Sequence, residues 1–232
     1  MKLIPPPPQD FAVYIGKSGT LYGEREEGDS LTTIYHSGYL PYSGARGLHN
    51  IFYTARSARV LLHAFSPSSE NRRIAKKFDG QFKKERIPAS QFVPSEAFWG
   101  FCNTYFTQKH GEKSMPKERL HTILESSLVS TIITYIKDAT PVAYVLEVED
   151  GSMGHFWFSF YDLSYSKQSL GLWLMLDCIR DAKERGIEHY YLGTVYGTKA
   201  LYKLNFEPLE WWDGAQWSIN IGLLKELGRS DS

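Results

Sequence analysis

The stretch FYDLSYS at residues 160 to 166 holds the side chain of this chain that is best suited to acid–base chemistry. Asp162 follows a run of aromatic residues, so its carboxylate is expected at the exposed end of a strand, with Tyr161 beside it. A carboxylate in that place suits the capture of a proton from an amine, or the binding of an ammonium group. The alternative is a turn aspartate that accepts backbone N–H bonds, which is the commoner role of an isolated Asp.

A second group of candidates lies in HYYLGTVYGTKALYKLNF, residues 189 to 206. Within its predicted strand, Gly193 indicates a bulge or a close approach of two backbones. Lys199 and Lys203 are four residues apart, so on a helical turn both ammonium groups share one face, with Tyr202 beside the second. Such a face suits a phosphate or a ribose, although a solvated lysine face is the commoner explanation.

The segment YSKQSLGLW, residues 165 to 173, precedes a long apolar run and is expected to open a helix. Acyl-CoA N-acetyltransferases place a Gln/Arg-x-x-Gly-x-Gly/Ala loop at such a junction, where bare N–H groups hold a pyrophosphate. Gln168 and Gly171 match that loop. The last small position is instead Trp173, whose indole is expected to crowd the phosphates, so a simple helix start is the preferred interpretation.

The segment SPSSENRRIAKKF predicts a helix with basic residues on one face. Arg72 and Lys76, like Arg73 and Lys77, are four residues apart and therefore form one basic stripe. A local stripe in a neutral protein is the best candidate for contact with an RNA backbone. A solvated helix face is an equally good explanation.

The elements that must position these residues follow from hydrophobic patterning. FAVYIG, LTTIYH, NIFYTA and RVLLHAF predict a strand-rich region up to about residue 65, and QFKKERIPASQF is polar with a breaking proline. SEAFWGFCNTYF and KERLHTILESSL predict amphipathic helices. VSTIITYIKD, TPVAYVLEVEDG and GHFWFSFYDL predict strands, which are followed by a long helix with Gly186 as its C-terminal cap, a strand, a short helix and a strand.

A helix between two strands of one sheet is the crossover unit of a mixed sheet, and this order suits an acetyltransferase-like fold. We therefore expect an α+β protein with a GNAT-like mixed α/β sheet in its C-terminal half. The predicted division is residues 1–90, a strand-rich region with the basic helix, and residues 91–232, a transferase domain.

Composition narrows the function classes. The chain has 232 residues, and 26 basic residues balance 26 acidic ones, so net charge does not point to a nucleic-acid partner. Two distant cysteines indicate a reducing compartment, and neither a signal peptide nor a membrane-spanning run is recognised, so a cytoplasmic location is expected. No serine-hydrolase motif, P-loop or metal-ligand spacing occurs, which predicts no metal and no cofactor.

Taken in order, several segments resemble the aminoacyl-tRNA–protein transferases, that is, the arginyl-transferases and their bacterial leucyl-transferring relatives. The resemblance covers about residues 35 to 217 and rests on ARVLLHAFSPSSENRRI, FVPSEAFWGFCNTYFTQKHG, FYDLSYSKQSLGLW and HYYLGTVYGTKALYKLNFEPLE. It implies an acetyltransferase-like fold that uses charged tRNA as co-substrate and transfers its amino acid to the N-terminal amine of an acceptor protein. No membrane is involved, and the oligomeric state stays open.

The same resemblance implies roles for individual residues. Asp162 and Tyr161 would act at the reacting amine, and the basic stripe would touch the tRNA acceptor stem. The 3′ end of the charged tRNA would be held by a larger set: Arg59, Gln168, Ser169, Tyr191, Gly193, Lys199, Tyr202 and Lys203.

Two departures from the family pattern bear on function. The family's second acid in Phe-Tyr-Asp-Pro-Asp is Ser164 here, and YHSGYLPYSGARGLHNIFY lacks the family's cysteine cluster, which excludes an iron–sulfur or zinc site in that region by ligand count. Two other function classes stay open beside the transferase. They are an acetyl-CoA-dependent N-acetyltransferase and a non-catalytic relative that binds tRNA or peptide.

Overall fold

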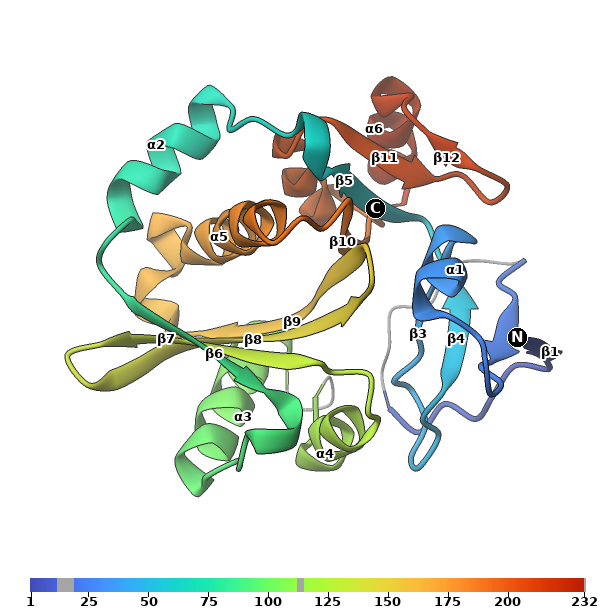
Figure 1. Ribbon diagram of the computed structural model, residues 1–232, viewed down its shortest axis with the longest axis horizontal. Helices are drawn as coiled ribbons and strands as arrows, with labels where there is room; N and C mark the ends of the chain where they lie inside the picture. The colour runs from blue at the N-terminus through green and yellow to red at the C-terminus, as the bar shows by residue number, and fades with distance from the viewer. Residues whose placement is uncertain (12–18, 112–114, 232) are drawn as a thin grey trace.

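A computed structural model describes residues 1–11, 19–111 and 115–231 of the chain. Within these residues the strands form two sheets, of eight and of four strands, and the eight-stranded sheet is sandwiched between helices (Figure 1). The helices α2 and α5 lie over one of its faces, and α3 and α4 lie over the other. The six α-helices of this part of the chain are α1 (Leu31–His36), α2 (Ser69–Phe78), α3 (Glu96–His110), α4 (Lys117–Glu125), α5 (Leu170–Glu184) and α6 (Ile221–Ser230).

The large sheet mixes antiparallel ladders with one parallel pair. Its order is β12 (Trp217–Ser218), β11 (Leu209–Trp212), β5 (Ser57–Leu61), β10 (His189–Thr194), β9 (Met153–Tyr161), β8 (Thr140–Asp150), β7 (Thr131–Lys137) and β6 (Lys83–Pro88). Only β9 and β10 run parallel, because α5 connects them as a crossover helix. This mixed sheet with helices on both faces is the expected α+β, acetyltransferase-like architecture.

The small sheet has the order β1 (Lys2–Ile4), β2 (Tyr22–Glu24), β4 (Ile51–Thr54) and β3 (Tyr39–Pro41). Together with α1 it packs beside the large sheet on the side of β5 and β10 (Figure 1). Tyr35 of α1 is completely buried in this contact, and Trp217 of β12 donates its indole N–H to the carbonyl of His36. The two sheets therefore share a packed boundary.

The parallel pair separates after a short ladder, and this separation positions the site. Pairing extends over three residues of each strand, from Met153 to His155 in β9 and from His189 to Tyr191 in β10. Beyond Tyr191 a bulge interrupts the pairing of β10 with β5, and Gly193 adopts a left-handed backbone with φ of 79°. The two strands thus leave an opening between them, flanked by the small sheet.

The predicted helix ends are confirmed where a capping residue marks them in the sequence. Ser68 and Asn71 form a reciprocal capping box at the start of α2, and Ser95 accepts the N–H of Phe98 at the start of α3. Gly186, with φ of 82°, follows the end of α5 as expected of a C-terminal glycine. The expected short helix near residue 200 is the 3₁₀-helix η4 (Thr198–Asn205), and three further 3₁₀-helices are described: η1 (Leu62–Ala64), η2 (Ala89–Gln91) and η3 (Leu163–Gln168).

One expectation about an element is wrong, because tertiary packing decides, and one segment without a predicted element is a strand. LTTIYH is the helix α1 and not a strand, since Ser30 caps it and Leu31, Ile34 and Tyr35 bury one helical face. The polar segment around residues 83 to 88 is the edge strand β6, paired with β7 along six residues. FAVYIG lies largely outside the described residues. The predicted domain boundary between residues 90 and 91 stays a prediction. Along the chain, β4, which ends at Thr54, belongs to the small sheet, and β5, which begins at Ser57, belongs to the large sheet.

Candidate active site at the opening between two strands

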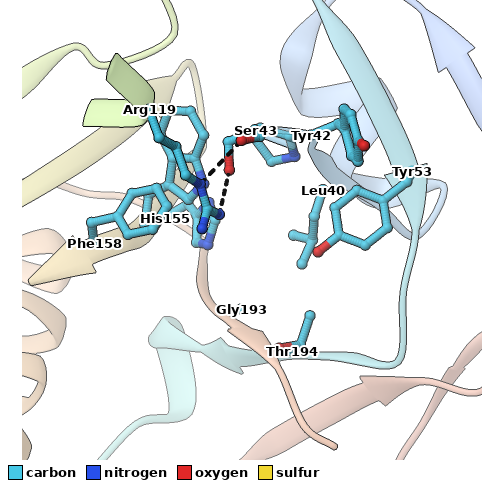
Figure 2. Close-up of a pocket in the computed structure, with 11 residues that line it drawn as sticks. Leu40, Tyr42, Ser43, Tyr53, Arg119, His155, Phe158, Gly193 and Thr194 are labelled. Atoms are coloured by element: carbon cyan, nitrogen blue, oxygen red, sulfur yellow. Dashed lines mark hydrogen bonds between the residues drawn. The ribbon is translucent and has the colours of Figure 1, made fainter. Parts of the chain in front are cut away.

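A cavity of about 190 Å³ lies where β9 and β10 separate, between the large and the small sheet (Figure 2). We call it the interstrand cavity. Its wall combines apolar, phenolic and cationic side chains with an open stretch of backbone. It is lined by residues of β3 and the loop after it, of β4, α4, β9 and β10: Leu40, Pro41, Tyr42, Ser43, Tyr53, Arg119, His155, Trp157, Phe158, Gly193 and Thr194.

His155 is the polar group of this wall with an unused nitrogen. Its side chain is 2% exposed, and its Nε2 atom has no hydrogen-bond partner, whereas Nδ1 lies 2.9 Å from the hydroxyl of Tyr35. Burial, together with the nearby charge of Lys203, lowers the pKa of His155 to about 3. The imidazole is therefore neutral at physiological pH and presents one unsatisfied nitrogen beside the cavity.

Lys203 approaches the same place from η4. Its Nζ donates to the carbonyl oxygen of Thr194 at 2.7 Å, and burial lowers its pKa to about 8. A carbon atom built onto Gly193 in place of its missing side chain would lie 3.7 Å from Nζ of Lys203 and 3.7 Å from Nε2 of His155. Two nitrogen groups from different elements therefore converge on the space above Gly193.

Arg119 places a positive charge on the opposite wall. It extends from α4, is buried, and donates to the carbonyl and the hydroxyl of Ser43, the latter at 2.8 Å (Figure 2). Burial lowers its pKa to about 10, while the phenols of Tyr53 and Tyr42 act in the opposite direction. The guanidinium remains charged at neutral pH, so the cavity suits an anionic group.

A second hollow, of about 220 Å³, lies at the other end of β9, beside the start of α5. The αL residue Ser169 precedes this helix and makes no capping hydrogen bond through its side chain, and both Ser169 and Gly171 line the hollow. Gly171 packs under the ring of Tyr161, whose hydroxyl is hydrogen-bonded to Lys109 of α3. Tyr202 lines the same hollow, and the arrangement suits a phosphate.

Asp162 lies outside both of these hollows. It is exposed, and its Oδ1 accepts the backbone N–H of Ser164 at 2.9 Å, which caps η3. It borders a shallow pocket of about 560 Å³ between the start of η3 and α3, together with Tyr161. This geometry supplies the turn role that was the alternative for Asp162, and its catalytic role stays a prediction.

The structure separates the two lysines that were expected to share a face. Lys199 is exposed while Lys203 is 9% exposed. The reason is that residues 198 to 205 form a 3₁₀-helix, in which positions i and i+3 superpose and positions i and i+4 do not. The prediction of a shared ammonium face is therefore wrong, and of the two lysines only Lys203 is buried and approaches Gly193.

Other predicted binding residues are scattered. Arg59 pairs with Glu210, its guanidinium lies 4.1 Å from the ring centroid of Trp217, and it donates to the hydroxyl of Tyr191. This cluster lies on β5 and β10, and it lines none of the hollows described above. Gln168 is exposed on η3. For each of them, a role in binding the tRNA 3′ end stays a prediction.

Trp173 does not crowd the start of α5. Its indole is buried on the far side of the helix, where Nε1 donates to Asp79 at 2.8 Å and the ring packs against Phe78 and Phe82. The expectation that this side chain blocks a pyrophosphate is wrong, because position 173 faces α2 and not the hollow. Trp173 therefore does not exclude CoA from the start of α5.

The basic stripe lies on α2. Arg72, Arg73 and Lys76 are exposed and Lys77 is half-buried, whereas Ile74 and Phe78 hold the opposite face in the core. Arg73 is partly neutralised by an ion pair with Glu70. The stripe is thus accessible, and its contact with RNA stays a prediction.

His155, Tyr35 and Arg119 were not predicted from the sequence. Each lies in an apolar or amphipathic segment, and their contacts join residues 120 and 76 positions apart. A histidine within the aromatic run GHFWFSFY was the one available signal. Elsewhere, the described residues contain no group of three or more His, Cys, Asp or Glu placed to hold a metal ion, and none of their helices is long and apolar enough to cross a membrane.

The fold is an α+β, GNAT-like fold, and residues 110–204 match the family model described as "Acetyltransferase (GNAT) domain". Over 199 residues the chain is 33% identical to aspartate/glutamate leucyltransferase of Rhizobium meliloti, a match that covers 74% of each protein. The enzyme of the same name from Jannaschia sp. is 27% identical and covers 79% of this chain and 68% of the relative. The chain therefore belongs to the aspartate/glutamate leucyltransferase family, an aminoacyl-tRNA transferase family.

Among solved structures, L-PGS from Bacillus licheniformis is similar with a TM-score of 0.46 and 14% identity, over 73% of this chain and 50% of that one.

Proposed function

We propose that this protein transfers an amino acid from charged tRNA to the N-terminal amine of an acceptor protein. Membership of the leucyltransferase family supports the reaction class. The observation that carries the assignment of the site is the unpartnered Nε2 of His155 beside the interstrand cavity. An aminoacyl ester is already activated, so the protein needs chiefly to hold it against the acceptor amine and to stabilise the developing charge.

We propose leucine as the donated amino acid. The relatives are named leucyltransferases. The apolar residues Leu40 and Phe158 in the wall of the cavity suit the apolar side chain of a donated leucine. The buried guanidinium of Arg119 lies in the same wall. A second guanidinium, from a donated arginine, would meet like-charge repulsion there.

The acceptor is proposed to begin with Asp or Glu, in agreement with the names of the relatives. Arg119 offers the matching charge, since a guanidinium binds a carboxylate through strong charge-assisted hydrogen bonds. The start of α5, with Ser169 and Gly171, is the proposed place for a phosphate of the tRNA 3′ end.

The basic stripe of α2 is the proposed contact for the acceptor stem. Reversal of Arg72, Arg73, Lys76 and Lys77 to Glu should weaken tRNA binding and flatten its salt dependence, by about one unit of slope per lost phosphate contact. An unchanged slope would make the stripe a solvated helix face.

Transfer assays test the proposal directly. Labelled Leu-tRNA and Arg-tRNA are each offered with peptides that begin with Asp, Glu, Asn or Gln, and acetyl-CoA is offered in parallel. Leucine transfer to the Asp and Glu peptides is expected. Acetylation with no aminoacyl transfer would replace the proposal by an acetyltransferase, and tRNA binding with no transfer would leave a binding protein.

A further inference from the structure

The space above Gly193 is bordered by two nitrogen atoms and by little else. Leaving out the neighbours of Gly193 in the chain, Nε2 of His155 and Nζ of Lys203 are the two described atoms within 4 Å of a carbon built there. The left-handed backbone of Gly193, with φ of 79°, keeps this place free of a side chain. The missing side chain therefore leaves room over Gly193 for a substrate atom to approach both nitrogens.

The tautomer of His155 follows from its partner. Tyr35 is completely buried, and the one hydrogen bond that its hydroxyl makes with the described residues is to Nδ1 of His155. Because a buried hydroxyl proton must be donated, Nδ1 is the acceptor. The proton of the neutral ring then resides on Nε2, which is therefore a donor directed at the space above Gly193.

Lys203 supplies a second donor. With a pKa of about 8, its ammonium group is mostly charged at neutral pH, and one of its three protons is used by the carbonyl of Thr194. The remaining protons are available to an oxygen above Gly193. A neutral imidazole N–H and an ammonium thus both lie close to the space over Gly193.

We propose that His155 and Lys203 form an oxyanion hole over Gly193, which binds the carbonyl oxygen of the aminoacyl ester. This inference rests on the proposed function. The acceptor amine attacks the ester carbonyl carbon, and the π electrons move to the oxygen, where the two donors hold the negative charge. The C–O bond to the tRNA ribose then breaks, an amide bond forms, and the proton lost by the amine ends on the ribose oxygen.

A matched pair of glycine variants tests the space. Gly193→Ala places a methyl group between the two donors, whereas Gly197→Ala introduces a left-handed alanine of similar φ, 69°, with no atom nearby. Gly193→Ala should lower single-turnover leucine transfer by about 10²-fold, the effect of losing an oxyanion donor, with Leu-tRNA binding unchanged. Equal activity of both variants would overturn the proposal.

A ring variant tests the donor itself. His155→Phe keeps a buried ring without a donor and should lower the transfer rate at saturating Leu-tRNA by about 10²-fold. Its KM should stay the same, because the lost bond strengthens in the transition state. A change confined to KM, or a variant as active as the wild type, contradicts the role.

Nitrogen-15 NMR of histidine-labelled protein adds a readout without turnover, with His155 assigned by its absence in His155→Phe. The neutral, Nε2-protonated form should persist from pH 5 to 8, and Tyr35→Phe should release the tautomer. The Nδ1-protonated form in the wild type would overturn the oxyanion hole. Absence of leucine transfer by wild-type protein would instead defeat the proposed function, so the two failures are distinct.

Discussion

The two ends of strand β9 differ in what they offer to chemistry. Near its start, His155 is buried with an unsatisfied donor beside the interstrand cavity. At its end, Asp162 is exposed and its carboxylate already caps a turn. The end carries the recognisable motif, while the start carries the unsatisfied polar group. A recognisable motif and an unsatisfied buried group therefore lie at different ends of one strand, and each end is a candidate site.

The two ends of β9 also differ in the charged groups around them. Burial lowers the pKa of Arg119, in the wall of the cavity, to about 10 and that of Lys203, beside Gly193, to about 8. Both shifts come from desolvation of a charged form that the fold tolerates, and such groups concentrate at functional sites. The cavity is thus preorganised for an anion or an oxyanion.

Removal of the charge at Lys203 should have the largest effect. Lys203→Met keeps the length of the side chain and removes its hydrogen-bond donor, so the rate of transfer should fall by about 10²- to 10³-fold. The free energy of unfolding at pH 7 should rise, since a buried charge is lost. Lys225→Met, at an exposed lysine of α6, is the control and should keep wild-type activity in a single-turnover assay.

Arg119→Met should abolish the preference for acidic acceptors. A charge-assisted hydrogen bond contributes about 1.5–3 kcal/mol, so wild-type protein should prefer Asp and Glu peptides over Asn and Gln peptides by about 10- to 100-fold. Competition assays with mixed peptides measure this ratio. Ser43→Ala, which removes one hydroxyl contact of the guanidinium, is the control and should retain the preference. An unchanged ratio in Arg119→Met would place acceptor recognition elsewhere.

The pH dependence of transfer should carry the signature of Lys203. As pH rises through about 8 its ammonium loses the donor proton, so the transfer rate should fall about tenfold per unit above that value. His155 adds no limb between pH 5 and 9, because its pKa is about 3. The falling limb should be absent in Lys203→Met. A limb retained in that variant would assign it to another group.

The same shift predicts a change of stability with pH. The pKa of Lys203 is 10.5 as an unperturbed group and about 8 in the folded protein, so between these values the unfolded state binds more protons. The free energy of unfolding should therefore rise with pH across that window relative to Lys203→Met, in denaturant titrations at each pH.

Asp162→Asn should have the smallest effect. An asparagine side-chain oxygen still accepts the N–H of Ser164, so folding and the turn should be preserved. If transfer takes place in the interstrand cavity, the rate should change by less than about threefold, which is under 1 kcal/mol. A loss of 10²-fold with an unchanged melting temperature would return the chemistry to the end of β9.

Sequence reasoning reached the fold because its signals are local. Ser68 and Ser95 cap their helices, and the run of residues 140 to 150 can only be a buried strand. It failed at LTTIYH, whose β-branched residues favour a strand until the packing of Tyr35 is known. It placed Gly193 and Lys203 among the candidates, yet it could not foresee that Lys199 faces water.

The rest of the site depends on contacts that no local pattern encodes. Tyr35 fixes the tautomer of His155 from 120 residues away, and Ser43 holds Arg119 from 76 residues away. Trp173 shows the opposite error, in which a motif position was assumed to face the ligand while its side chain packs against α2. In each case the orientation of the side chain within its element, and not the residue type, decides whether the residue faces the site.

The most direct measurement is a crystal structure with 3′-leucylamido-adenosine, a stable amide analogue of the charged tRNA end. Its carbonyl oxygen is expected above Gly193, within about 2.7–3.1 Å of both Nε2 of His155 and Nζ of Lys203. A leucyl carbonyl bound instead beside Tyr161 and Asp162, with the space above Gly193 unfilled, would contradict it.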